Sequence, residues 1–183
     1  MDYIGIEEIT NGPRIFVRKR HVDPRGSFEM AIELEILKAF FPNMPNFQQV
    51  NILTNNKGAL RGFHGSDESE NHWKVVTTIS GSVREAFLDI RKKSNTYGKV
   101  SFIDLDHNSN CTIVIPPGFA HGVQSHEDNT IIMYATNISY ELNKEEFFHP
   151  ISSIWENLWE KPLIISEKDK NAKVFSFDVK DML

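Results

Sequence analysis

Short runs of apolar residues rich in Val, Ile and Thr recur along most of the chain, with polar residues and turns between them. β-Branched residues favour extended backbone, so each run predicts a β-strand, as at residues 13–20, where Ile15 and Val17 alternate with Phe16 and Arg18. Turn residues separate the stretches, as at Ser80-Gly81. The predicted strands are 13–20, 47–53, 74–79, 83–90, 100–105, 112–115 and 131–136. Strands this short and this regularly spaced favour an all-β jelly roll or small barrel.

Three segments outside these strands are predicted to be helical. Residues 32–41 carry apolar residues at helical spacing before Pro42, which cannot continue a helix. A segment that begins at Ser152 contains two tryptophans and suggests a short packed helix, and residues 166–169 have the spacing of a helix-capping box. No internal repeat, low-complexity tract or linker divides the chain. We therefore expect one domain over residues 1–183, a barrel with short flanking helices that its C-terminal part closes.

Composition and charge narrow the possible functions. The 183 residues are 40% hydrophobic and include 13 Phe, 8 Pro and 10 Gly, which fits one substantial core built from strands. A net charge of -5 with interleaved acidic and basic residues provides no basic stripe, so we expect no nucleic-acid partner. No apolar run approaches the roughly 20 residues that span a bilayer, and the first residues lack the features of a signal peptide. With Cys111 as the single cysteine, expected to be an inert small apolar side chain, we predict a cytoplasmic protein without a membrane partner.

Polar residues inside the apolar strands mark the candidate chemistry. A side chain that points into a barrel loses its hydration, so it needs a partner or a chemical task. Four clusters fit this description: Arg61-Gly62-Phe63-His64 followed by Lys74; Asp89-Ile90-Arg91; Pro116-Pro117-Gly118-Phe119-Ala120-His121-Gly122; and Tyr134 with Tyr140 and Glu145.

One of these clusters raises the possibility of a metal site. The spacing Pro-x-Gly-x-x-His, which ends at His121, resembles the second signature of the cupin superfamily, where that histidine can bind a metal. A metal-binding cupin also needs a His-x-His pair, whereas His64 is followed by Gly65-Ser66. Three or four ligands in a recognisable spacing are missing, so we expect no metal. The other histidines have polar neighbours and are expected in loops or at the surface: His21, His72, His107, His126 and His149.

A series of motifs follows one order along the chain, from about Phe16 to Asp169. In that order they are Asp23-x-Arg25-Gly26-x-Phe28, Phe47-x-Gln49-x-Asn51, Arg61-Gly62-Phe63-His64, Asp89-Ile90-Arg91 with Ser94-x-Thr96-Tyr97-Gly98, Ile115-Pro116-x-Gly118-Phe119-Ala120-His121-Gly122, the residues Tyr134, Tyr140 and Glu145, and Ser166-x-Lys168-Asp169. Each motif is weak alone, but the collinear set is specific. It resembles the dTDP-4-dehydrorhamnose 3,5-epimerase family over almost the whole chain.

The resemblance implies a cupin-type jelly-roll barrel that acts as an epimerase without metal or cofactor. Its substrate would be a nucleotide-linked 4-keto-6-deoxy sugar, similar to dTDP-4-dehydro-6-deoxyglucose, whose C3 and C5 protons are weakly acidic beside the ketone. By the resemblance, His64 removes such a proton and leaves an enolate, while Asp169 orients the imidazole. Tyr134 would return a proton on the opposite face, and Lys74 would stabilise the enolate oxygen.

The resemblance also implies the substrate contacts and the assembly. Arg25 would reach the nucleotide diphosphate bound by a neighbouring subunit, which implies a homodimer. The implied pathway is the biosynthesis of deoxysugars or of surface polysaccharide such as lipopolysaccharide. The other implied substrate-binding residues are Gln49, Asn51, Arg61, His121, Tyr140, Glu145 and Lys168.

Several of these residues also have structural explanations. Asp169 could cap a helix that begins at Ser166, and Tyr134 could pack with its hydroxyl at the rim of an apolar strand. Asp89 and Arg91 are expected to form a structural ion pair at a strand end. The remaining candidates that could be core or turn residues are His64, His121 and Glu145.

The departures from the family pattern concern the substrate side. A glutamate usually stands five positions after the arginine of the first motif, and here that position is Met30. Glu29 stands one residue earlier, which in a strand is the opposite face. Gly65-Ser66 replaces an aromatic residue and glutamine, and His72 replaces a glutamine. The alternatives are therefore an epimerase of C3 or C5 alone, a ketoisomerase of another nucleotide sugar, and a non-catalytic carbohydrate-binding jelly roll.

Overall fold

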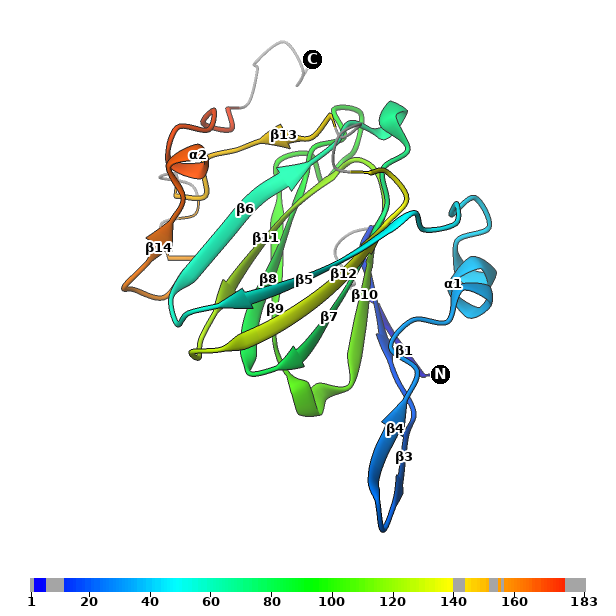
Figure 1. The fold of residues 1–183 in the computed structure, drawn as a ribbon. Helices are drawn as coiled ribbons and strands as arrows, with labels where there is room; N and C mark the ends of the chain where they lie inside the picture. Colours follow the sequence, from blue (N-terminus) through cyan, green and yellow to red (C-terminus); the bar gives the residue numbers. More distant parts are fainter. Residues whose placement is uncertain (1, 6–11, 140–143, 152–154, 156, 177–183) are drawn as a thin grey trace.

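Two antiparallel sheets face each other and form the body of the molecule (Figure 1). The structure is a computed structural model that describes residues 2–5, 12–139, 144–151, 155 and 157–176. The first sheet contains, in spatial order, β1 (Asp2–Gly5), β2 (Arg14–Val17), β10 (Cys111–Ile115), β7 (Lys74–Ser80), β12 (Thr130–Thr136) and β5 (Gln49–Asn55). The second contains β13 (Glu146–Phe147), β6 (Ala59–Gly65), β11 (Phe119–Ser125), β8 (Ser82–Asp89) and β9 (Val100–Asp106), and β14 (Ile164–Ile165) runs parallel to β6.

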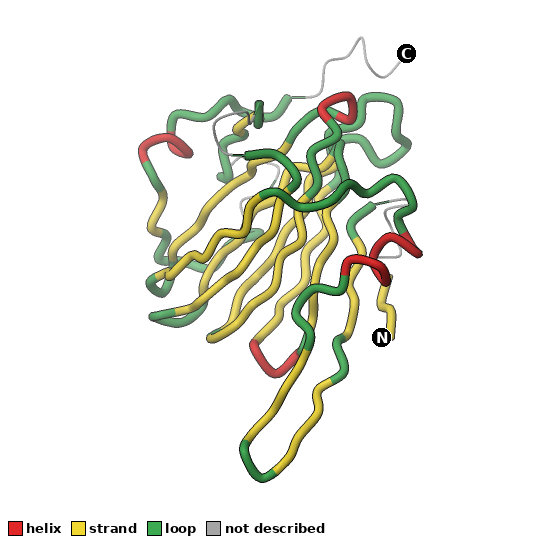
Figure 2. The backbone as a smooth tube through the Cα atoms, turned by 45° about the vertical axis from the view of Figure 1, so that its right-hand side comes forward, coloured by secondary structure: helices red, strands yellow, loops and turns green. Residues whose placement is uncertain are grey.

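Short helices and one hairpin complete the described part of the chain. The helices are α1 (Leu34–Phe40), η1 (Glu68–Glu70), η2 (His107–Ser109) and α2 (Glu167–Lys170). The hairpin consists of β3 (Arg20–Asp23) and β4 (Gly26–Glu29), which pair only with each other and extend away from the barrel (Figures 1 and 2). The architecture confirms the predicted all-β jelly-roll barrel with short flanking helices. None of the helices in the described residues is long and apolar enough to cross a membrane.

Apolar side chains fill the space between the sheets and also cover both outer faces. Ile113, Val76 and Phe87 belong to the interior cluster, whose buried members come from both sheets. On the outer face of the first sheet, Leu37 of α1 packs in a cluster that includes Val75 and Val114. The outer face of the second sheet is covered by C-terminal residues: Phe148, Trp155, Leu158, Trp159 and Phe175. Polar residues on the inner face of either sheet therefore lie in largely apolar surroundings and stand out as candidates for function.

Two strands that carry candidate residues were not predicted. Glycines interrupt the strand pattern at Gly62 and Gly65 in β6 and at Gly122 in β11. The glycines are required because the two strands approach closely. A Cβ atom on Gly62 would lie 2.5 Å from the Cα of Gly122, and one on Gly65 would lie 2.4 Å from the Cα of Ala120. The local pattern therefore misses these strands for a reason that only their pairing reveals.

The observed bounds of several other elements differ from the predicted ones. The expected strand over residues 13–20 is divided, because β2 ends at Val17 and the hairpin begins at Arg20. The expected helix over residues 32–41 is confirmed as the shorter α1. The prediction of a helix around Trp155 and Trp159 is wrong for the described residues 155 and 157–159, which form bends and a turn. Both indoles are nevertheless buried against Phe63, so packing of the outer face explains the tryptophans without a helix.

Candidate active site

A cavity of about 830 Å³ lies at one end of the barrel, between the two sheets. The inward positions of the first sheet explain why it forms there. Ile132 and its partner Leu53 form an apolar row across the strands. Two residues further along the strands, Tyr134 lies beside Asn51. The next row is polar and consists of Thr136 with its two neighbours, Lys74 and Gln49. The inner face therefore changes from apolar to polar within four residues. Apolar packing fills one end of the barrel, and polar side chains leave a cavity at the other.

An imidazole and a carboxylate form the central couple of one wall. His64, on β6, brings its Nε2 atom within 2.6 Å of Oδ1 of Asp169, on α2. Burial alone would raise the pKa of Asp169, but hydrogen bonds from His64 and Ser166 and the charge of His64 outweigh burial, so the pKa is lowered. An ionised Asp169 accepts the Nε2 proton of His64, which leaves Nδ1 as the basic nitrogen. The ring of Phe147 packs edge-on against the imidazole at 4.6 Å between centroids.

The helix that carries Asp169 is capped by a different residue. The Ser166 hydroxyl accepts a hydrogen bond from the backbone N–H of Asp169 at 3.1 Å, which is the usual N-cap arrangement. The carboxylate of Asp169 therefore does not cap the helix. Only 3% of the residue is exposed. A short capped helix thus fixes this side chain against His64.

The opposite wall, from the first sheet, carries a phenol and an ammonium group. Tyr134 on β12 and Lys74 on β7 both line the cavity, with Tyr134 between Asn51 and Val76 in the register of the sheet. The Nζ atom of Lys74 forms an ion pair with Glu145. The side chains of this pair are 14% and 9% exposed, so Glu145 does not lie in a solvated turn.

A second imidazole–carboxylate couple lies beside the first. His121 is the cross-strand neighbour of His64, and its Nε2 atom is hydrogen-bonded to Glu85 of β8. Glu85 is 1% exposed, and Phe87 stacks on the His121 ring at 5.8 Å between centroids. The two histidines and their carboxylates therefore form a polar wall that faces Tyr134 and Lys74 across the cavity.

Comparison with known proteins decides the family. The sequence pattern of the dTDP-4-dehydrorhamnose 3,5-epimerase family matches residues 8–176. The chain is 34% identical over 145 residues to the dTDP-4-dehydrorhamnose 3,5-epimerase of Mycobacterium tuberculosis, covering 79% of this chain and 68% of that protein. The chain belongs to the dTDP-4-dehydrorhamnose 3,5-epimerase family. The family predicted from the collinear motifs is thereby confirmed.

Two further relatives bear on the fold and on specificity. The dTDP-6-deoxy-D-glucose-3,5-epimerase of Legionella pneumophila, solved in complex with dTDP-4-keto-L-rhamnose, superposes with a TM-score of 0.85 at 25% identity. That likeness covers 94% of this chain and 92% of the other, so it extends over the whole jelly roll. The chain is also 24% identical to a dTDP-4-dehydro-6-deoxyglucose 3-epimerase from a Streptomyces species, over 83% of this chain and 79% of the relative. Proteins named as 3,5-epimerases and a protein named as a 3-epimerase are therefore both similar to this chain.

Most of the site residues predicted from the family motifs converge on the cavity. Arg25 is the exception among those described, because it lies at the turn of the β3–β4 hairpin with its side chain 90% exposed and paired with Asp23. Tyr140 lies outside the described residues. The predicted residues that line the cavity are His64, Asp169, Tyr134, Lys74, Gln49, Asn51, Arg61, His121, Glu145 and Lys168.

The polar contacts of the cavity rim tie several of these side chains together. Gln49 donates a hydrogen bond to Asn51 Oδ1 at 2.7 Å, and Arg61 donates one from Nε to Asn55 Oδ1 at 2.9 Å. The ammonium group of Lys168 lies 3.6 Å from the centroid of the Phe147 ring. These contacts hold the amides and cations at the mouth of the cavity before any ligand enters.

His72 corrects one prediction, since it is buried and lines the cavity instead of lying at the surface. Its Nε2 atom is 2.7 Å from the Thr136 hydroxyl. Burial, and then the charge of Lys74, lower the pKa of His72 to about 4, against a smaller opposing effect of Glu145. The side chain is therefore a neutral imidazole at neutral pH. Its polar sequence neighbours misled the prediction, because His72 lines the cavity whereas the next residue, Trp73, packs in the cluster on the outer face of the first sheet.

One residue that supports the cavity was not predicted although the sequence carried a recognisable signal for it. Glu85, the hydrogen-bond partner of His121, is a charged residue in the middle of an apolar strand, the same pattern that identified the four clusters. Thr136 and Phe147 gave no such signal, because a threonine at a strand end and an aromatic residue in a short strand are common in any β protein.

The ion pair of Asp89 and Arg91 is structural, as expected. Asp89 is fully buried and accepts hydrogen bonds from Arg91 Nε at 2.9 Å, from Ser94 at 2.8 Å and from Thr96 at 2.5 Å. Burial alone would raise its pKa, but these hydrogen bonds outweigh burial and lower it. The pair holds the turn after β8 and does not line the cavity. Across the described residues, no group of three or more His, Cys, Asp or Glu side chains is arranged to hold a metal ion.

Proposed function

We propose that this chain epimerises a dTDP-linked 4-keto-6-deoxy sugar at C3, at C5 or at both carbons. The observation that carries the proposal is the approach of an imidazole–carboxylate couple, His64 with Asp169, and a phenol, Tyr134, to one cavity from opposite sheets. An epimerase must remove a proton from one face of a carbon and return one to the other. Groups on two facing walls meet this requirement.

The first step would be proton removal by Nδ1 of His64. Because Nε2 donates to Asp169, the carboxylate holds the ring in the basic tautomer and stabilises the imidazolium ion that forms. The electron pair left on the carbon would pass to the C4 oxygen as an enolate. Lys74 is the cation on the facing wall, and its charge would stabilise that oxygen.

The second step would be proton return by Tyr134 from the facing wall. A phenol is a weak acid of pKa about 10, but an enolate carbon is basic enough to accept its proton. The net change is the inversion of one carbon with no oxidation, so the reaction consumes no cofactor. The imidazole of His121 and the amides of Gln49 and Asn51 would hold the sugar by hydrogen bonds. His64 and Tyr134 could then act again at the second carbon.

An epimerase of one carbon is the second candidate. It is supported by the relative that is named a 3-epimerase, whose similarity covers 83% of this chain, against 79% for the 3,5-epimerase of Mycobacterium tuberculosis. The position of Tyr134 in the cavity lining favours an epimerase of either kind over a ketoisomerase, which needs no acid on the opposite face. A purely carbohydrate-binding jelly roll would need an aromatic groove, whereas most of the described cavity lining is polar or aliphatic.

The proposed enzyme acts as a homodimer, with the β3–β4 hairpin of each copy reaching the other. Arg25 lies at the tip of this hairpin, which extends away from the barrel (Figure 1), and its exposed guanidinium group is suited to a diphosphate. Val22 and Phe28 on the same hairpin are 75% and 66% exposed, which favours burial against a second copy. We also propose a cytoplasmic location, which fits a nucleotide sugar as substrate and a single unpaired cysteine.

The test is incorporation of solvent deuterium into dTDP-4-keto-6-deoxyglucose, followed by NMR at C3 and C5. His64→Ala should slow the exchange by about 10²- to 10⁴-fold, the usual contribution of a general base. His107→Ala, which alters an exposed histidine on η2, is the matched control and should keep the full rate. Exchange at both carbons supports a 3,5-epimerase, and exchange at one carbon supports the narrower enzyme. A folded protein that shows no exchange, or exchange that survives His64→Ala, would refute the proposal.

A further inference from the structure

The β3–β4 hairpin is anchored to the barrel only at its root. Its two strands pair with each other from Arg20 with Glu29 to Asp23 with Gly26, and with no strand of either sheet. Most of its residues are exposed, including Val22 and Phe28. The orientation of the hairpin relative to the barrel therefore depends on the side chains at its base.

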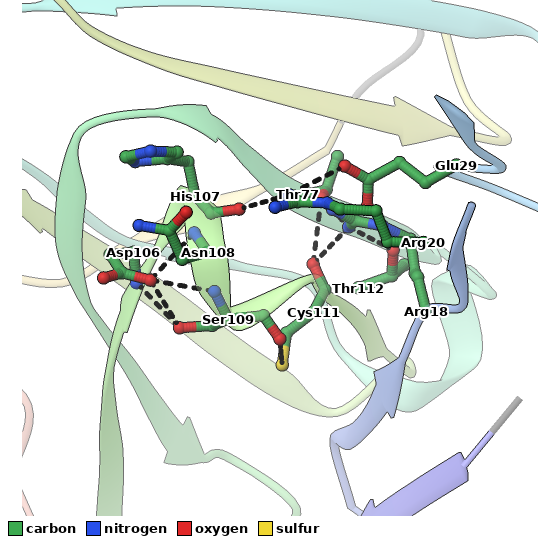
Figure 3. A network of polar contacts seen from close by, with 10 residues as sticks. All are labelled: Arg18, Arg20, Glu29, Thr77, Asp106, His107, Asn108, Ser109, Cys111 and Thr112. Carbon is green, nitrogen blue, oxygen red and sulfur yellow. Dashed lines mark hydrogen bonds and ion pairs between the residues drawn. The ribbon is translucent and has the colours of Figure 1, made fainter. Parts of the chain in front are cut away.

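Glu29 connects the hairpin to the barrel at that base (Figure 3). Its carboxylate accepts hydrogen bonds from Arg18 Nε at 2.9 Å and from Arg20 at 3.1 Å. Arg18 is 5% exposed and reaches across the first sheet to the hydroxyls of Thr77 and Thr112. Glu29 thus joins the end of β4 to a guanidinium group that is itself fixed on β7 and β10.

Arg20 provides a second tie, to η2. Its guanidinium group donates to the carbonyl oxygen of His107 at 3.1 Å. That carbonyl is held in place because Asp106 caps η2, accepting from the backbone N–H groups of Asn108 at 2.9 Å and Ser109 at 2.8 Å. The base of the hairpin is therefore fastened to two different parts of the barrel, by Glu29 to Arg18 and by Arg20 to η2, and Glu29 also holds Arg20 in place.

The charge on Glu29 is essential to this arrangement. Burial alone would raise the pKa of Glu29, but the hydrogen bonds and charges of Arg18 and Arg20 outweigh burial and lower it. With Glu29 neutral, the nearly buried Arg18 would lose the carboxylate that compensates its charge. Glu29 faces the two arginines, whereas Met30, at the position where the family has glutamate, is 46% exposed.

We propose that Glu29 is a positioning residue that sets the angle of the β3–β4 hairpin and thereby delivers Arg25 to the nucleotide diphosphate in the cavity of a second copy. This inference rests on the proposed function and on the proposed homodimer. A loosened hairpin would hold Arg25 in the binding orientation for a smaller fraction of the time, and the apparent affinity falls by that fraction. Because Arg25 binds a part of the substrate remote from the reacting carbons, its loss weakens binding and leaves the chemical step unchanged.

The first experiment compares Glu29→Gln with wild type in steady-state epimerisation and in calorimetric binding of dTDP. We expect KM and the Kd of dTDP to rise on the order of tenfold while kcat stays within about twofold. Asp104→Asn is the matched control, because Asp104 also pairs with an arginine, Arg84, but lies on β9 away from the hairpin. If Glu29→Gln does not fold, Arg20→Met replaces it. The Arg20 side chain is 27% exposed, and the substitution removes its contacts with Glu29 and with the His107 carbonyl. Unchanged KM and Kd in a folded variant would overturn the inference.

The second experiment separates delivery to the partner from a defect within one chain. A mixed dimer is prepared from one chain with His64→Ala and an intact hairpin, and one chain with Glu29→Gln and an intact cavity. The one active cavity belongs to the Glu29→Gln chain and receives the intact hairpin of the His64→Ala chain. We therefore expect wild-type KM and about half the kcat per dimer. A KM that stays raised in the mixed dimer, or a wild-type protein that is monomeric, would contradict the inference.

Failure of the inference about Glu29 can be distinguished from failure of the proposed epimerase function. Wild-type protein that exchanges no deuterium refutes the epimerase, and the Kd of dTDP then decides the role of Glu29 by itself. In that case, a Kd that rises in Glu29→Gln and returns to the wild-type value at half of the sites in the mixed dimer supports delivery of Arg25. A Kd that is the same in wild type and Glu29→Gln opposes it.

Discussion

His72 is predicted to make the protein less stable between pH 7 and pH 5. The folded chain holds this side chain as a neutral imidazole, because burial and the charge of Lys74 lower its pKa from 6.5 to about 4. In the unfolded chain, His72 would bind a proton near the ordinary histidine pKa of 6.5. Between these two pKa values the unfolded state binds more protons than the folded state, so the free energy of unfolding falls as the pH falls.

The size of the effect follows from the two pKa values. His72 contributes its full stabilisation above about pH 6.5 and loses it progressively towards pH 4. From pH 7 to pH 5, the two pKa values correspond to a loss of about 2 kcal/mol. For a chain of this length, that loss lowers Tm by about 4 to 8 °C.

The assay compares wild type with His72→Gln, in which the side chain stays neutral at every pH and can still hydrogen-bond Thr136. Thermal unfolding is followed by circular dichroism at pH 7 and pH 5. The decrease in Tm should be smaller in His72→Gln by about 4 to 8 °C. His107→Gln, which removes an exposed imidazole, should follow wild type. If His72→Gln and wild type lose the same Tm, His72 is not held neutral by burial and the reasoning is wrong.

Three further predictions concern the site and its support. Asp169→Asn should lower kcat about 10- to 100-fold, because a charge-assisted hydrogen bond to His64 is worth about 1.5 to 3 kcal/mol, and an unchanged kcat would contradict the role of the couple. Tyr134→Phe should retain deuterium exchange into the substrate while formation of the inverted product falls about 10²-fold, as NMR would show, and equal losses of both would argue against Tyr134 as the acid. Asp89→Asn should destabilise the fold by about 3 kcal/mol in urea unfolding with kcat unchanged, because it leaves Arg91 without its buried partner, and a loss below about 1 kcal/mol would refute this.

The sequence by itself determined the class of fold and the family. Runs of β-branched and other apolar residues, such as residues 74–79 and 131–136, are a local pattern, so their number and spacing predicted a β-barrel. The motifs around His64 and His121 are also local, and their order along the chain identified the family before any contact between them was known. Local patterns are sufficient for these conclusions because each strand and each motif spans at most 12 residues, the length of the stretch from Tyr134 to Glu145.

Only the tertiary structure decided which of these residues meet and in what state. His64 and Asp169 are 105 positions apart, and Lys74 and Glu145 are 71 apart, so no local pattern reports that each pair is joined. The tertiary structure also buried His72, which its polar neighbours had suggested was exposed. The physical reason is the same in each case. Periodicity describes how a segment presents its own side chains, whereas burial, pKa and ion pairing depend on the segments that pack against it.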